Sequence, residues 1–299
     1  MDTAIPIPTF PDSRPMELTD KPLLDRLFAD LQPRISEFTF AGLYLFRNAH
    51  SYRMTTVGNS LVLLGCGYGG GNQYFLPPLS GRVEDALTEL FTAGFTLYGA
   101  DEAFADRYLT GEGLEVAEDR DSFDYLYLRN ELAELPGNRY HKKKNRVNYF
   151  AKRHSYVIEL FTENHVEGCL QLNEEWQQVR ISEENLSAGP EAAATAEGLR
   201  LAGELGLDGV VAIIEGRVKG FALGERLNHE TSVCHFEKSD AFIEGISQLV
   251  DQEFNRRLFT DCIFVNREQD LGEPGLRAAK LSYHPTELVK KYRARFRVG

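Results

Sequence analysis

The chain is poor in the patterns that mark secreted, membrane-spanning and metal-binding proteins. Its four cysteines, Cys66, Cys169, Cys234 and Cys262, lie far apart without paired spacing suited to zinc. We therefore expect free thiols in a reducing compartment, and no metal site. No run approaches the ~18 consecutive apolar residues that suggest a membrane helix, and residues 1–15 hold no apolar signal core. These absences predict a cytoplasmic protein with no transmembrane segment and no export signal.

The overall composition is that of an ordinary globular protein, with 42% hydrophobic and 26% charged residues. A length of 299 residues favours two compact domains. The net charge of −12 argues against a nucleic-acid binder, but the charge is distributed unevenly. Seven Lys/Arg and no acidic residue lie between Leu135 and Ile158, and five more basic residues follow position 289. The positive charge is therefore concentrated in two segments.

The first basic segment, residues 138–154, has a helical pattern. Lys142, Arg146 and Arg153 fall on one face together with Tyr149. Such a face suits a phosphate-rich partner, such as a tRNA acceptor end, a nucleotide or a phospholipid head group. The alternative is a solvated linking helix whose charges balance an acidic body. We predict phosphate or tRNA contacts for Arg139, Lys142, Lys143, Arg146 and Arg153.

The pattern of apolar residues predicts alternating helices and strands in both halves of the chain. In the first half we expect helices near 23–31 and 83–93, a hairpin of 54–57 with 61–64 about Gly58-Asn59, and a strand at 95–98. In the second half we expect helices at 166–180 and 199–205 and strands at 210–214 and 218–223. The shared element order suggests two domains, residues 1–150 and 151–299.

Residues 233–240 form an apolar strand that carries two titratable side chains. Because side chains alternate along a strand, His235 and Glu237 are expected on the same face, roughly 7 Å apart. Cys234 and Phe236 would take the opposite, apolar face. An imidazole beside a carboxylate suits acid–base chemistry. The alternative is a solvated face with a surface ion pair.

A polar segment, residues 266–272, follows the next apolar run, 262–265. Residues 265–272, together with residues 235–238 and 275–285, resemble the phosphatidylglycerol lysyltransferase C-terminal domain family, a branch of the N-acetyltransferase-like (GNAT) fold. A weaker match extends through residues 139–153. The resemblance implies an α/β (α+β) protein of two tandem GNAT-like domains, each a mixed twisted sheet flanked by helices. It also implies group transfer, with the active site in the C-terminal domain.

The resemblance gives the expected chemistry as aminoacyl transfer from aminoacyl-tRNA, the co-substrate, to an amine or hydroxyl acceptor, with no cofactor. The acceptor would be a small molecule or a lipid head group. Glu237 or His235 would act as the base, and Tyr283 as a donor near the leaving oxygen. Asp270 would bind a substrate ammonium. The remaining expected substrate contacts are Asn266, Arg267, Arg277 and Lys280.

Residues 238–245 depart from the turn with which CoA-dependent GNAT enzymes hold pyrophosphate at a helix start. Only Gly245 fits that turn, and Asp240 and Glu244 would repel phosphate. This argues against CoA. Two rival hypotheses remain: an acyltransferase that uses acyl-CoA, and a non-catalytic module that binds a phosphorylated ligand or lipid head group.

Two further features have ordinary interpretations. The glycine-rich segment 65–72 lacks the lysine and hydroxyl of a P-loop, and extended sequence follows it, so we expect a hairpin connection. A loop beside a substrate cleft is the alternative. Trp176, on an apolar helical stripe, is expected in the core.

Overall fold

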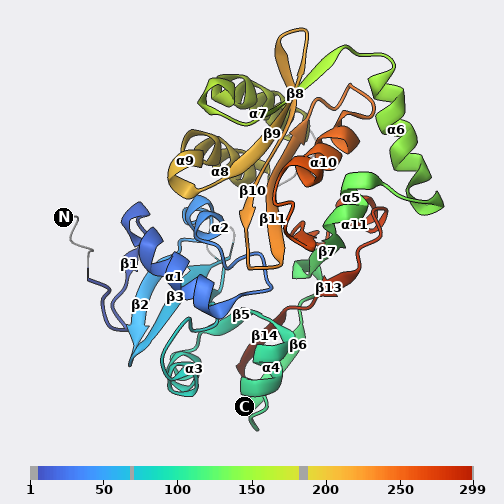
Figure 1. Ribbon diagram of the computed structural model, residues 1–299. Helices are drawn as coiled ribbons and strands as arrows, with labels where there is room; N and C mark the ends of the chain where they lie inside the picture. Colours follow the sequence, from blue (N-terminus) through green and yellow to red (C-terminus); the bar gives the residue numbers. More distant parts are fainter. Residues whose placement is uncertain (1–5, 68–70, 182–187, 298–299) are drawn as a thin grey trace. The chain divides into compact units, whose positions relative to one another are not determined.

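The computed structural model describes residues 6–67, 71–181 and 188–297, and the chain divides into two compact units (Figure 1). Unit 1 contains Met1–Asp124, Gln269–Arg277 and Leu288–Gly299. Unit 2 contains Tyr125–Glu268 and Ala278–Glu287. Each unit is therefore assembled from segments that are distant in sequence.

Unit 1 is built on a seven-stranded mixed sheet in the order β1-β2-β3-β4-β5-β14-β6. Its strands are β1 (Arg14–Pro15), β2 (Arg53–Val57), β3 (Ser60–Cys66), β4 (Gln73–Phe75), β5 (Thr96–Ala100), β6 (Leu114–Glu118) and β14 (Tyr292–Phe296). Its helices include α1 (Lys21–Leu31), α2 (Phe40–Leu45), α3 (Val83–Thr92) and α4 (Glu102–Tyr108). The last strand of the chain, β14, lies between β5 and β6 and is antiparallel to both.

Local sequence explains the first elements of unit 1. The hairpin of β2 and β3 closes with Val57 opposite Ser60, and Gly58 takes a positive φ of 60° as a tight two-residue turn requires. Helix α3 buries Leu87 and Leu90 against one face of the sheet, where they join a shared apolar core. The predicted hairpin and the predicted helix at 83–93 are confirmed.

Unit 2 contains most of a second seven-stranded sheet, in the order β13-β7-β12-β11-β10-β9-β8. Its strands are β7 (Asp124–Leu128), β8 (Tyr156–Leu160), β9 (Asp208–Ile214), β10 (Arg217–Arg226), β11 (Thr231–Ser239), β12 (Phe264–Asn266) and β13 (Glu287–Val289). Its helices include α5 (Arg129–Glu134), α6 (His141–Ala151), α7 (Val166–Ile181), α8 (Ala188–Arg200), α9 (Ala202–Leu205) and α10 (Ile246–Arg257). Helix α11 (Pro274–Leu281) runs from unit 1 into unit 2.

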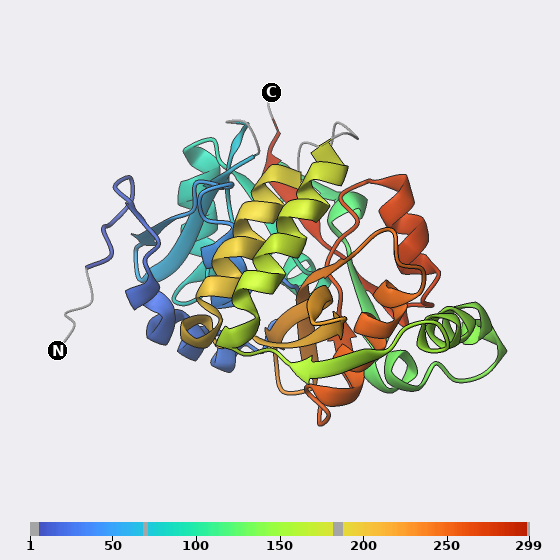
Figure 2. The same cartoon turned by 90° about the horizontal axis from the view of Figure 1, so that it is seen from above.

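Helices cover both faces of the second sheet. Gly220 of β10 lets α10 approach one face closely, since a Cβ there would lie 2.6 Å from Val250. Helices α7 and α8 run side by side on the other face (Figure 2). There the Nζ atom of Lys238, on β11, lies 3.3 Å from the centroid of the half-buried Trp176 ring. Trp176 thus packs between helix and sheet, and contacts a cation.

The chain does not divide near residue 150, where we expected the boundary between domains. Strand β7 and helices α5 and α6 precede that point, yet they belong to unit 2 because β7 pairs with β12. Strand β14 returns from the C-terminus to unit 1. In the glycine-rich segment, β3 and β4 pair as the expected hairpin, while residues 68–70 lie outside the described part of the chain. The cysteines are free, with Cys169 and Cys262 buried.

Candidate active site

Most of the polar residues singled out in the second half of the sequence gather at the end of a short parallel pairing in unit 2. Strand β11 pairs with β12 only over Thr231–Val233, because β12 ends at Asn266. Beyond Val233, β11 continues alongside β10. The side chains of Cys234 to Ser239 therefore emerge where the sheet loses a strand on one side. In mixed α/β sheets such places commonly hold ligands.

A β-bulge at His235 changes which side chains share a face. On β10, Leu223 lies opposite Phe236, but the next residue, Gly224, lies opposite Cys234. His235 is thus an extra residue in β11. Glu237, opposite Ala222, falls on the same face as Cys234 and on the face opposite Phe236. The predicted grouping of Cys234 with Phe236 was therefore wrong, because the alternation on which it depended is interrupted.

The bulge places the His235 ring between two carboxylates. Its Nε2 lies 2.9 Å from Glu225 Oε1 and its Nδ1 lies 2.8 Å from Glu268 Oε1. The ring is 1% exposed. Burial alone would lower the pKa of His235, but the two carboxylates outweigh it and raise this pKa to about 10. At neutral pH the ring is an imidazolium that joins β10 to the segment after β12.

Arg267 organises a second cluster on the α10 side of the sheet. Its Nη2 donates to Glu237 Oε2 at 2.6 Å, and its Nη1 lies 3.0 Å from Asp251 Oδ1. The guanidinium is 5.0 Å from the centroid of the Tyr283 ring. The Nζ of Lys143, from α6, lies 3.8 Å from the same ring. Two acids, two cations and a phenol thus surround one point in unit 2 (the Arg267 cluster hereafter).

The Arg267 cluster contains buried polar atoms without hydrogen bonds. Within the described residues, Asp251 Oδ2 and Arg267 Nη1 have no hydrogen-bond partner. Nη1 contacts Asp251 as a charge, without hydrogen-bond geometry. The Asp251 side chain is only 3% exposed. Buried polar atoms in native proteins are almost always satisfied, so these two mark a place where a ligand could supply the partner.

The burial of this cluster shifts its proton equilibria. Burial raises the pKa of Asp251 to about 7. The charge of Glu237 also raises this pKa, while the charge of Arg267 lowers it. Burial, together with repulsion from Arg267, lowers the pKa of Lys143 to about 8. Burial also holds the pKa of Tyr283 well above its usual value, so its phenol stays protonated. Two groups that titrate near neutral pH therefore lie side by side, a common property of catalytic sites.

The expected substrate contacts divide between the two units. Asn266 and Lys280 are in unit 2, and both shape the backbone around Arg267: Asn266 Oδ1 accepts from the Glu268 amide at 2.7 Å, and Lys280 Nζ donates to the carbonyl of Glu268 at 3.2 Å. Asp270 and Arg277 are in unit 1. The Asp270 side chain is fully buried and bonded to Arg277 and Arg120. These two arginines already neutralise the carboxylate that we expected to bind an ammonium.

The basic stretch forms the predicted helix, α6. This helix lies beside the Arg267 cluster. Lys143 points inward and donates to Ser282 Oγ at 2.7 Å. Lys142 and Arg146 are exposed, with Arg146 only 3.6 Å from Glu244, and the Arg153 guanidinium lies 3.5 Å from the ring centroid of exposed Tyr149. Arg139 forms an ion pair with Glu131. The outer face of α6 thus remains largely cationic beside the cluster.

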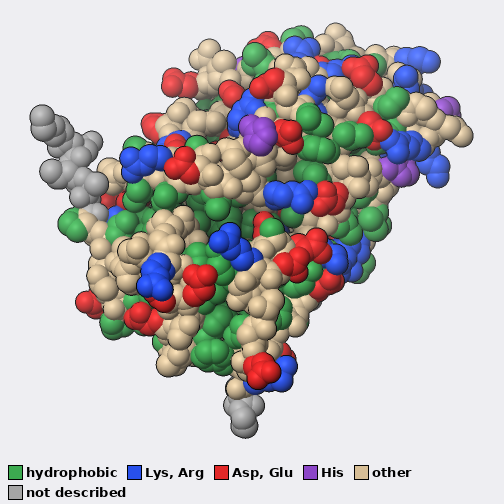
Figure 3. Space-filling view, turned by 60° about the horizontal axis from the view of Figure 1, so that its bottom comes forward, with side chains coloured by type: hydrophobic (Ala, Val, Ile, Leu, Met, Phe, Trp, Pro, Cys, Tyr) green, Lys and Arg blue, Asp and Glu red, His purple; other side chains and the backbone are tan. Residues whose placement is uncertain are grey.

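The basic C-terminal tail does not form a second cationic surface. In unit 1, Lys290 pairs with Glu118, and Arg295 of β14 pairs with Glu115 of β6. On the face shown in Figure 3, basic and acidic side chains are interspersed. The basic residues of the tail therefore form ion pairs with neighbouring acidic residues of unit 1. The cationic surface near the candidate site is that of α6.

Helix α6 also covers the start of α10. Gly245, the residue before α10, has φ 91°, and a Cβ there would lie 2.3 Å from the carbonyl oxygen of Arg146. Nearby, Asp240 pairs with Lys219 at 2.8 Å. The start of α10 is thus covered by protein backbone and flanked by carboxylates, which leaves it poorly suited to bind a pyrophosphate.

Sequence reasoning missed Asp251. Its helix, α10, carries an apolar stripe, but it also buries the polar residues Asp251, Gln252, Glu253 and Asn255. The spacing of Asp251 and Asn255, one helical turn apart within an otherwise apolar pattern, was the signal. Charged residues are rarely buried unless they are paired or functional.

Comparison with known proteins assigns the chain to a family. Residues 28–295 match the family model described as "Phosphatidylglycerol lysyltransferase, C-terminal". The chain belongs to this family. No curated protein matches it. Among the described residues, no helix combines the length and apolar character needed to cross a membrane.

Solved structures show the fold of this family member. A conserved protein of unknown function from Bacteroides thetaiotaomicron has 29% identity and a TM-score of 0.87, with 95% of this chain and 99% of that one covered. L-PGS from Bacillus licheniformis has 13% identity and a TM-score of 0.57, with 86% and 92% covered. FemX has 10% identity and a TM-score of 0.51, with 96% and 97% covered. The fold class that we predicted, two tandem GNAT-like domains with mixed sheets and flanking helices, is confirmed.

Proposed function

We propose that this family member is an aminoacyltransferase whose active centre is the Arg267 cluster of unit 2. The observation that carries the proposal is the buried carboxylate of Asp251, whose Oδ2 has no hydrogen-bond partner within the described residues and faces a site that also holds Glu237, Arg267 and Lys143. A substrate ammonium would satisfy that atom. The family match and the likeness to L-PGS and FemX support this class of reaction.

The transfer itself needs a base, an acid and donors for the developing oxyanion. In our proposal Glu237 accepts the proton of the acceptor amine or hydroxyl as its nitrogen or oxygen attacks the ester carbonyl. Arg267 and the Tyr283 phenol donate to the carbonyl oxygen. The ester bond to the tRNA ribose then breaks, and Lys143, whose pKa lies at about 8, gives its proton to the leaving ribose oxygen. The proton from the acceptor returns from Glu237 to Lys143.

His235 has a different part in this scheme from the one that we first considered. Its pKa of about 10 makes it a poor proton acceptor at neutral pH. As an imidazolium it holds Glu268 next to Arg267 and so positions the site. Of the two alternatives for the base, Glu237 is the one that the geometry supports. Asp251 takes the ammonium-binding role that we had expected for Asp270, because Asp270 is already paired with Arg120 and Arg277.

The outer face of α6 would receive the tRNA acceptor end. Its exposed Lys142 and Arg146 lie on the helix that delivers Lys143 to the cluster. Phosphate contacts of this kind depend on salt and add little sequence specificity. The covered start of α10 supports tRNA over acyl-CoA as the donor. We propose a cytoplasmic enzyme that needs no bound cofactor.

The test is incubation of the full chain with labelled aminoacyl-tRNAs and cell extract, following which label leaves tRNA and where it appears. Glu237→Gln should slow transfer by about 10²-fold to 10⁴-fold, the usual contribution of a general base. Glu204→Gln, an exposed glutamate of α9, is the matched control. Unchanged transfer by Glu237→Gln would remove the base assignment. Tight, salt-sensitive tRNA binding without turnover would indicate a binding module instead.

The contribution of α6 can be measured separately. The pair Lys142→Glu and Arg146→Glu should weaken tRNA binding and reduce the slope of log affinity against log salt by about one unit for each phosphate that the helix no longer neutralises. Arg26→Glu with Arg82→Glu changes the same number of exposed charges in unit 1. An equal loss of tRNA affinity in both double variants would show a general effect of net charge and not a tRNA site on α6.

A further inference from the structure

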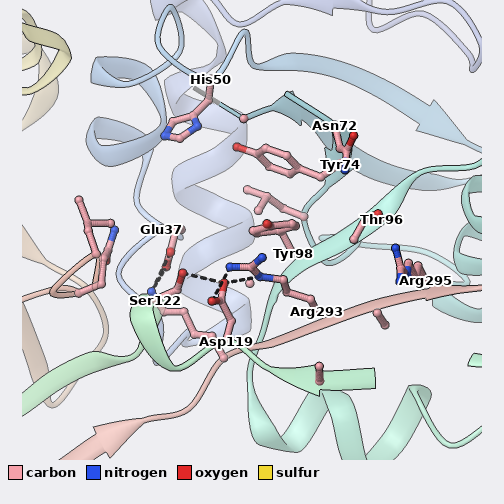
Figure 4. A pocket seen from close by; sticks show the side chains of 18 of the residues that line it. Glu37, His50, Asn72, Tyr74, Thr96, Tyr98, Asp119, Ser122, Arg293 and Arg295 are labelled. Atoms are coloured by element: carbon pink, nitrogen blue, oxygen red, sulfur yellow. Dashed lines mark hydrogen bonds and ion pairs between the residues drawn. The ribbon is translucent and has the colours of Figure 1, made fainter. Parts of the chain in front are cut away.

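A cavity of about 520 Å³ lies within unit 1, away from the residues assigned to transfer. This volume is in the range of small-molecule sites. The lining comes from β4, β5, β14 and the segments around them (Figure 4). Thr96 and Tyr98 of β5 reach it from the face opposite Leu97, which packs in the core with α3. The cavity thus lies on the face of the first sheet opposite α3.

Aromatic rings form one side of this cavity. The Tyr74 and Tyr98 rings are 4.9 Å apart between centroids, and Tyr52 and His50 continue the group, with 5.2 Å between their centroids. Figure 4 shows His50, Tyr74 and Tyr98 along one side of the space, across from Glu37. Burial lowers the pKa of His50, so its ring is neutral at physiological pH. This side therefore offers aromatic surface, and the Arg293 guanidinium lies 4.5 Å from the Tyr98 ring centroid.

Each charged side chain that lines the cavity is neutralised by a neighbour. Arg293 donates to Asp119 at 2.6 and 2.5 Å, and Arg295 donates to Glu115 at 2.8 Å. Lys291 Nζ lies 2.7 and 2.6 Å from the carboxylate oxygens of Glu37. The Arg293–Asp119 pair is bidentate and Lys291 is buried, so these two pairs are not readily exchanged for a ligand's charge, while the Arg295–Glu115 pair is exposed. The cavity is accordingly ill-suited to a ligand held by its charge.

Neutral polar groups are available instead. Within the described residues, the hydroxyls of Tyr98 and Thr96 make no hydrogen bond to protein, and the same is true of the Asn72 amide. All three lie among the lining residues next to the aromatic group. An uncharged ring with polar edges would stack on tyrosine and bond to these groups. A sugar ring would bond to them equally well but would gain less from flat faces.

We propose that this cavity is a second ligand site, which binds an uncharged heterocyclic base of the kind carried by nucleosides. The site stands independently of the proposed transferase activity, because none of the transfer residues lines it. It gives unit 1 a recognition role that the family assignment does not include.

Calorimetric titration of the full chain with adenosine, uridine, AMP and glucose tests the proposal. Adenosine or uridine should bind, AMP should bind within about threefold of adenosine because the arginines are already paired, and glucose should not bind. Absence of nucleoside binding at millimolar concentration would overturn the proposal. Preference for glucose, or binding of AMP more than tenfold tighter than adenosine, would also overturn it.

Three variants locate the binding. Tyr98→Leu should weaken nucleoside affinity by about tenfold or more, the loss typical of one base–aromatic stack. Tyr98→Phe keeps the ring and removes only the hydroxyl, so its nucleoside affinity should lie between those of wild type and Tyr98→Leu, which guards against a simple folding defect. Asp251→Asn, in the Arg267 cluster, should leave nucleoside affinity unchanged. If nucleoside affinity fell in Asp251→Asn but not in Tyr98→Leu, the nucleoside would bind in the transfer site, which would overturn the proposal.

Discussion

At the scale of single residues, Asp251 makes the sharpest prediction. The groups facing its carboxylate are Arg267, Glu237, Lys143 and the Tyr283 phenol. Because its pKa is about 7, Asp251 loses its negative charge below that pH and with it the attraction for an ammonium. The kcat/KM for aminoacyl-tRNA should therefore fall by about tenfold per pH unit below 7. Rate measurements from pH 5.5 to 8 on wild type and Asp251→Asn check this, and an acid limb that persists in the variant would contradict it.

The raised pKa of His235 predicts that the free energy of unfolding falls as the pH rises. Its folded pKa, about 10, lies above the unfolded value near 6.5, so the folded state binds the extra proton more tightly. Its stabilising contribution is complete below pH ~6.5 and declines by roughly 1.4 kcal/mol per unit as pH rises toward 10. The loss of unfolding free energy in His235→Gln should accordingly be largest near pH 6 and shrink by pH 10. Urea titrations at several pH values measure this, and a constant difference would show that the ring is not held as an imidazolium.

The sequence predicted which types of side chain form the candidate site. It did not predict a position that depends on an irregularity of the backbone. Glu237, Arg267 and Tyr283 come together as one cluster, as expected from residues of one functional segment. A single extra residue in β11 separated His235 from that cluster, and alternation cannot reveal a bulge. Asp251 was hidden because helix patterning draws attention to apolar residues and passes over a buried acid.

At the scale of elements, the packing of α6 on the start of α10 is a constraint that can be tested. Gly245→Ala would place a Cβ 2.3 Å from the Arg146 carbonyl oxygen at a φ of 91°. Steric clash and left-handed strain together should cost roughly 2–5 kcal/mol of unfolding free energy. Gly216→Ala is the control, since Gly216 has φ 75° and open space around it. Similar losses in both variants would mean that α6 does not press on α10.

Helices and hairpins were predictable because their signals are local. Turn residues at Gly58-Asn59, an apolar stripe on α3 and a run of β-branched residues in β9 each specify an element from adjacent residues. The partners of those strands were not predictable in the same way. The pairing of β14 with β5 joins residues about two hundred positions apart, and no local pattern encodes such a choice.

At the scale of the whole molecule, each sheet contains a strand from the other side of residue 150. We therefore expect that the chain cannot be divided at residue 150 into two fragments that fold. A fragment of residues 1–150 would lack β14, which fills the place between β5 and β6. A fragment of residues 151–299 would lack β7, which lies between β13 and β12. We expect neither fragment to show a cooperative thermal transition by circular dichroism, while the intact chain does. A sharp transition in either fragment would show that the missing strand is dispensable.

The position of β14 also has a consequence for the newly made chain. Translation delivers residues 96–118 long before residue 292, so β5 and β6 wait with unpaired edges throughout synthesis of the intervening polypeptide. The first sheet can close only when β14 has emerged from the ribosome. A nascent chain stalled a few residues short of β14 would therefore present open strands to chaperones and to aggregation, however well its remaining sequence folds.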